Sequence, residues 1–128
     1  MRRPVLLAAA AVVVMLAAGC GGKANYSRAE TRACLKGKDV RIDDKLDFVA
    51  STATGGAFVA HLDGNFVTVL FGEDADDAEE LENAYQRFAF PNVKEGLPDV
   101  LRRDRNAVML WHKHPSDDDL ATVTGCLK

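Results

Sequence analysis

The chain has 128 residues, with 16 Lys or Arg against 19 Asp or Glu and a formal net charge of −3 at pH 7. This length suits one domain with a single hydrophobic core. The acidic excess disfavours nucleic acid and anionic lipid headgroups as partners, because both select a basic face.

The first 20 residues have the three parts of a secretory signal. Arg2 and Arg3 form a basic start, residues 5–18 are an uninterrupted run of Ala, Val, Leu and Met, and small residues lead to Cys20. The apolar run has 14 residues, whereas a helix needs about 20 to cross a bilayer. The pattern therefore favours a cleaved signal over a permanent transmembrane anchor.

The segment Leu16-Ala17-Ala18-Gly19-Cys20 resembles the lipobox of bacterial lipoproteins, in which the cysteine is lipidated and becomes the first mature residue. The resemblance departs at one position: the favoured leucine stands one place early, and Ala17 takes its usual slot. It implies that residues 1–19 are removed and that Cys20 carries acyl chains such as palmitate. Gly21-Gly22-Lys23 then favours a short flexible tether, so residues 20–25 are expected to be the lipidated cysteine and its tether. The alternatives are a buried structural cysteine or a soluble secreted product.

The number of acyl chains decides how firmly such a protein is held. One chain binds a membrane only marginally, whereas two or more hold it stably. The resemblance thus implies a protein anchored to the outer face of the cytoplasmic membrane, or to the outer membrane of a cell that has two. Without Arg2 and Arg3, 14 basic residues face 19 acidic ones, so the mature chain has a net charge of −5.

If Cys20 carries lipid, Cys34 and Cys126 remain as a pair in an oxidising compartment, where an even number of cysteines indicates a disulfide. Both stand near the ends of the single domain expected over residues 26–128. A redox-active pair is the alternative, but it would favour a Cys-x-x-Cys spacing or a basic, exposed setting.

The first elements of the domain follow from caps and alternation. A Ser-x-x-Glu capping box at Ser27 predicts a helix over residues 28–36, with Gly37 as its C-terminal cap. Residues 40–42 alternate as in a short strand, and Asp43-Asp44 can cap a second short helix that ends before Gly55.

A β-hairpin is the clearest prediction. Residues 57–62 and 66–71 are rich in Phe, Val and Leu, and Asp63-Gly64-Asn65 between them has strong turn propensity. A long amphipathic helix follows, because acids occupy its first turns and apolar residues recur at spacings of three and four until Pro91. The members of this apolar face are Ala78, Leu81, Tyr85 and Phe88.

The last third begins with the least regular segment. Residues 100–103 suit either an edge strand or a helical turn, and residues 107–112 are predicted to form a strand. Ser116 then caps a final helix, which carries Leu120, Val123 and Leu127 towards the core.

The elements run α, β, α, β, β, α, β, α. Without the flanking helices they have the β-α-β-β-α-β order of the ferredoxin-like split unit. We therefore expect an α+β two-layer sandwich with a four-stranded, mainly antiparallel sheet and extra N- and C-terminal helices joined by the disulfide. A generic antiparallel α+β sandwich is the alternative.

Five identities at an offset of 41 residues suggest an internal repeat of turn, strand and acid-capped helix. They pair Asp63, Asn65, Val67, Asp76 and Asp77 with Asp104, Asn106, Val108, Asp117 and Asp118. Shared preferences of turns and helix caps explain the same match without a repeat.

His112 and His114 are the candidate metal ligands. If the strand extends through His114, both imidazoles point to one face, and Asp117, the other acids of residues 117–119 or His61 could complete a site of nitrogen and oxygen ligands. The competing interpretation is that these histidines are ordinary surface residues and that the aspartates cap the last helix.

No catalytic residue or cofactor is predicted. The chain lacks a Gly-x-Ser-x-Gly elbow and a phosphate-cradling glycine loop, and the expected disulfide would leave no thiol for catalysis. Of the aromatic residues that often dominate interfaces, Tyr26, Tyr85 and Trp111, the last two are expected in the core.

By elimination, the sequence favours a non-catalytic binding or interaction module of the bacterial envelope, similar to other small lipoproteins. Its expected partners are the membrane, through lipid on Cys20, and an envelope protein or small ligand. The alternative is a metal or small-ligand carrier that uses the region of His112, His114 and residues 117–119.

Overall fold

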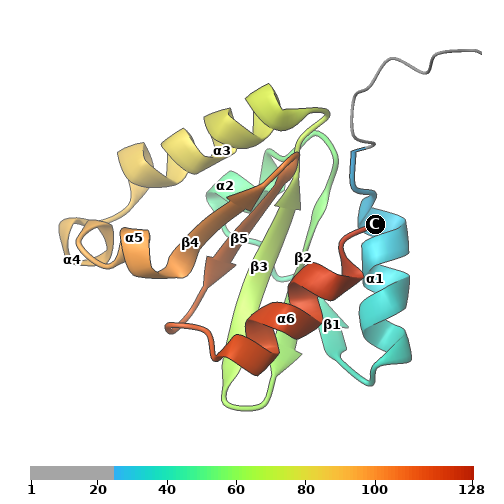
Figure 1. Ribbon diagram of the computed structural model, residues 1–128. Helices are drawn as coiled ribbons and strands as arrows, with labels where there is room; N and C mark the ends of the chain where they lie inside the picture. Colours follow the sequence, from blue (N-terminus) through green and yellow to red (C-terminus); the bar gives the residue numbers. More distant parts are fainter. Residues whose placement is uncertain (1–24) are drawn as a thin grey trace, which may run out of the picture.

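The computed structural model describes residues 25–128 (Figure 1). The predicted signal segment, Cys20 and nearly all of the predicted tether lie outside these residues. Among residues 25–128, no helix is both long and apolar enough to cross a membrane.

The described chain is α+β, with six helices and one antiparallel sheet of five strands. The helices are α1 (Arg28–Gly37), α2 (Phe48–Ser51), α3 (Ala75–Phe88), α4 (Pro91–Lys94), α5 (Leu97–Val100) and α6 (Asp117–Cys126). The strands are β1 (Arg41–Asp43), β2 (Ala57–Leu62), β3 (Asn65–Phe71), β4 (Leu101–Asp104) and β5 (Ala107–Trp111). Their order across the sheet is β1-β2-β3-β5-β4.

The expected four-stranded ferredoxin-like order is not confirmed. A split β-α-β unit needs parallel strands on either side of its helix, but β1 and β2 are antiparallel neighbours. The intervening α2 has 4 residues, about 6 Å of helix, which is too short to return the chain along β2. The fifth strand is β4, so the ambiguous segment forms both alternatives: the short helix α5, then an edge strand.

Helices cover both faces of the sheet, unlike those of the expected two-layer sandwich (Figure 1). On one face, α1 and α6 pack over a core that includes Phe58 and Trp111. On the other, α2 and α3 pack over a second core that includes Leu70 and Tyr85. The predicted burial of Tyr85 and Trp111 is confirmed.

Local signals placed most element ends correctly. The β2–β3 hairpin turns at Asp63-Gly64, where Gly64 has a φ of +74°. Ser27 Oγ caps α1 by accepting from Glu30 N at 3.4 Å, although the left-handed residue after this helix is Asp39 and not Gly37.

The predicted start of the second helix, after a cap at Asp43-Asp44, is wrong, because α2 begins at Phe48. Asp43 ends β1, and Asp44 pairs with Arg28 at 3.0 Å (Nη2 to Oδ1). The cap is Asp47, whose Oδ1 accepts from Ala50 N at 2.8 Å.

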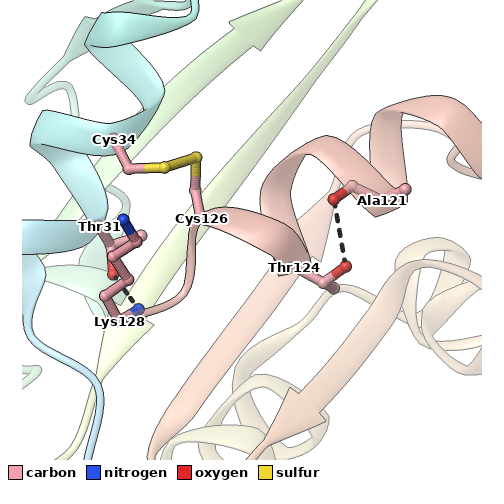
Figure 2. The surroundings of a disulfide bond; sticks show 6 residues. All are labelled: Thr31, Cys34, Ala121, Thr124, Cys126 and Lys128. Carbon is pink, nitrogen blue, oxygen red and sulfur yellow. Dashed lines mark hydrogen bonds between the residues drawn. A yellow bond between two sulfur atoms is a disulfide. The ribbon is translucent and has the colours of Figure 1, made fainter.

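The predicted disulfide is confirmed. Cys34 of α1 and Cys126 of α6 are bonded, with their Cα atoms 5.4 Å apart (Figure 2). Beside it, Lys128 N donates to Thr31 Oγ1 at 3.2 Å, so the C-terminus lies against α1.

The identities at an offset of 41 do not mark a structural repeat. The hairpin turns, at residues 63–64 and 105–106, and the starts of α3 and α6 are each 42 residues apart. A one-residue slip moves a strand side chain to the other face: Val67 faces α1 and α6, whereas Val108 faces α2 and α3.

Candidate functional site

The face of the sheet that packs against α2 and α3 is covered by these helices over only part of its length. On this face, three rows of side chains run across the neighbouring strands β2, β3 and β5. The row Ala57, Leu70 and Val108 lies in the core beneath α2 and α3. The next row is Val59, Thr68 and Leu110, and the outermost is His61, Phe66 and His112, which we call the His-Phe row.

The His-Phe row is a ladder of three rings. The Phe66 centroid lies 5.8 Å from that of His61 and 4.4 Å from that of His112, which stacks at 12°. His112 N donates to Phe66 O at 2.9 Å, which continues the β3–β5 pairing one residue beyond β5. Phe66 remains 36% exposed, so part of an aromatic ring is open to solvent between two imidazoles.

Two cavities of about 300 Å³ and 230 Å³ adjoin this row and share Asp47, Phe66 and Thr68. We call them together the groove. The first is further lined by Asp43, Lys45, Val59 and His61. The second is further lined by Val93, Val100, Leu110, Trp111 and His112.

Two carboxylates, those of Asp43 and Asp47, are held in position at the groove, and Asp43 is held by Lys45 and His61. Asp43 Oδ1 accepts from Lys45 N at 3.0 Å, and Asp43 Oδ2 lies 2.5 Å from His61 Nε2. The hydrogen bond from the Lys45 main chain, followed by that from His61, lowers the pKa of Asp43 below its usual value. Asp43 therefore stays ionised at neutral pH.

Asp47 links the groove to the covered part of the face. Its Oδ2 accepts from the Tyr85 hydroxyl at 2.8 Å. Burial, followed by the charge of Asp47, raises the pKa of Tyr85 well above its usual value. Tyr85 thus remains a neutral donor, and it holds the Asp47 carboxylate at the groove wall.

A patch of exposed apolar side chains borders the groove. Phe48, Phe88 and Phe90 are 72%, 62% and 76% exposed, and Val93, at 43%, belongs to both the patch and the groove lining. Phe48 and Phe88 make an edge-to-face contact at 6.0 Å. Phe88, the last member of the predicted apolar face of α3, is therefore not buried in the core, because its ring meets Phe48, the exposed first residue of α2.

The predicted metal ligands do not converge. β5 ends at Trp111, so the strand does not extend through His114. His114 Nδ1 instead lies 2.6 Å from Asp99 Oδ1, and Asp117 lies in the first turn of α6. Within residues 25–128, no three His, Cys, Asp or Glu side chains are grouped closely enough to hold a metal ion.

Sequence reasoning missed Asp43, Lys45, Asp47 and Phe66. A usable signal existed for Phe66, because the hairpin register places it opposite His61. No local sequence pattern predicts that Asp47 and His112 lie close to this pair, because both residues come from distant segments.

A separate cavity of about 390 Å³ lies between α3, α4, α5 and β4. Leu97, Pro98 and Leu101 provide apolar lining, and Gln86 and Lys94 provide polar groups. It contains none of the residues proposed as ligands from the sequence.

No family model, curated protein or solved structure matches this chain.

Proposed function

We propose that this protein is a non-catalytic binding module of the bacterial envelope, anchored by lipid on Cys20, and that its groove binds a partner protein. The observation that carries the binding proposal is Phe66, exposed on an uncovered sheet face between the two cavities.

The form of the groove favours a protein over a small molecule. Its two halves, of about 300 Å³ and 230 Å³, adjoin the exposed Phe66. Each half suits a single inserted side chain. The neighbouring Phe48, Phe88 and Phe90 add exposed aromatic area of the kind that stabilises protein interfaces.

The anchor rests on the resemblance of residues 16–20 to a lipobox. The disulfide adds support, because it suits an oxidising compartment and leaves Cys20 as the one cysteine outside the pair. The metal-carrier alternative has no comparable support, since its ligands do not converge.

A photo-crosslinking amino acid at Phe66, in the native envelope, tests the binding proposal. We expect an adduct with one discrete protein, and none from the same group at Ala121, an exposed control position on α6 of the opposite face. Equal adduct yields at the two positions would contradict the proposal.

Competition then tests whether the groove itself is recognised. Excess Cys20→Ser protein, which cannot be lipidated, should suppress the adduct. The Cys20→Ser, Phe66→Ala variant should need a concentration at least about tenfold higher for the same suppression, as expected for an interface hot spot. Undiminished competition by this variant would count against the groove.

A further inference from the structure

The first described residues are bound firmly to one end of the sheet. Tyr26 N donates to Asn106 Oδ1 at 2.7 Å, and Asn106 Nδ2 donates to Tyr26 O at 2.9 Å and to Gly72 O at 3.0 Å. Asn25 Nδ2 donates to Glu73 O at 2.6 Å. The point at which the N-terminal segment leaves the domain is therefore part of the fold.

The C-terminus lies at the same end. Ser27 N donates to Lys128 O, and Figure 1 shows the C-terminus beside the start of α1. We call this the tether end of the domain.

The His-Phe row lies at the other end of the central strand. β3 runs from Asn65, beside Phe66, to Phe71, beside Gly72 at the tether end. Seven residues of strand span about 20 Å. The β2–β3 turn extends further still, and Figure 1 shows it at the end of the sheet away from the C-terminus.

We infer that the anchored protein stands with its tether end towards the bilayer and its groove about 20 Å further out, an inference that rests on the proposed lipid on Cys20. The chain from Cys20 to Asn25 reaches about 18 Å at full extension. This reach is less than the length of β3 plus the turn, so the domain cannot invert to place its hairpin end on the membrane. The groove consequently meets its partner at a distance from the membrane surface.

Energy transfer in vesicles tests this orientation with the full, lipidated protein. One donor dye is attached through an azide-bearing residue, at Glu73 of the tether end or at Asp63 of the hairpin turn, both exposed. The vesicles are of phosphatidylcholine with a trace of acceptor-labelled lipid. We expect stronger transfer from Glu73, corresponding to a donor about 20 Å closer to the bilayer than one at Asp63.

The outcomes separate the orientation from the anchor. Equal transfer from both positions would mean that the domain lies on its side, and stronger transfer from Asp63 would mean that it is inverted; either overturns the orientation alone. Intact mass identifies the acyl chains on Cys20, and Cys20→Ser protein should give no transfer. If native protein carries no lipid and stays off the vesicles, the anchor and this orientation both fail.

Discussion

Asn65 and Asn106 each make three hydrogen bonds to main-chain groups beside a hairpin, but their surroundings differ. Asn65 bonds Phe66 N and both main-chain groups of Lys113 in a partly exposed setting. Asn106 is 1% exposed and holds Tyr26 and Gly72. Water can replace the Asn65 bonds, whereas loss of the Asn106 side chain leaves buried polar groups without partners.

We therefore expect Asn106→Ala to lower the free energy of unfolding by about 2–4 kcal/mol, since each buried group left without a partner costs about 1–3 kcal/mol. Asn65→Ala, its matched control, should cost about 1 kcal/mol or less. Urea unfolding followed by circular dichroism measures both. Equal losses would show that burial does not govern these contacts.

At the level of the elements, α2 is too short to be stable alone and depends on its connection to the sheet. Gly55 N donates to Phe71 O at 2.8 Å, and Phe71 N donates to Gly56 O at 2.9 Å. A Cβ on Gly55 would lie 2.7 Å from Phe71 O and 2.8 Å from Phe71 Cβ. The absence of a side chain at Gly55 thus allows the chain to lie against the end of β3.

Gly55→Ala should destabilise the domain by about 1–3 kcal/mol, the usual cost of overpacking. Gly37→Ala is the control with the opposite expected sign. Gly37 is the last residue of α1, and a Cβ at this position would meet nothing within 4 Å. Alanine is favoured over glycine in helices by up to about 1 kcal/mol. Thermal unfolding compares the two variants; a Gly55→Ala protein as stable as Gly37→Ala would contradict the packing argument.

For the whole molecule, the disulfide joins the first helix of the domain to the last. Cys34 and Cys126 are 92 residues apart in sequence, so their bond encloses most of the described chain. Helices α1 and α6 also share one core over the sheet. The bond therefore acts mainly by reducing the conformational entropy of the unfolded chain, and less through any single contact in the folded domain.

The Cys34→Ala, Cys126→Ala variant should lose about 4–5 kcal/mol of stability, the chain-entropy value for a loop of this length. The midpoint of urea unfolding measures the loss, and wild-type protein in reductant should show a similar one. A loss of about 1 kcal/mol or less would mean that packing of α1 on α6 suffices without the covalent bond.

The sequence by itself determined the features that depend on near neighbours. The Ser27 cap, the Asp63-Gly64 turn and the periodicity of α3 follow from local hydrogen bonds, backbone φ preferences and side-chain spacing. The pairing of Cys34 with Cys126 followed from cysteine number and the resemblance at Cys20. The lipid on Cys20, the envelope location and the groove partner remain predictions.

Only the tertiary structure decided the sheet order and the groove. Strand order depends on which distant segments pair, and the expected order failed because α2 has one turn instead of the length of a crossover helix. The groove likewise joins Asp43, His61, Phe66 and His112 across β1, β2, β3 and the end of β5. No local pattern encodes that meeting, because it depends on the register of four strands and on where α2 and α3 stop covering the sheet.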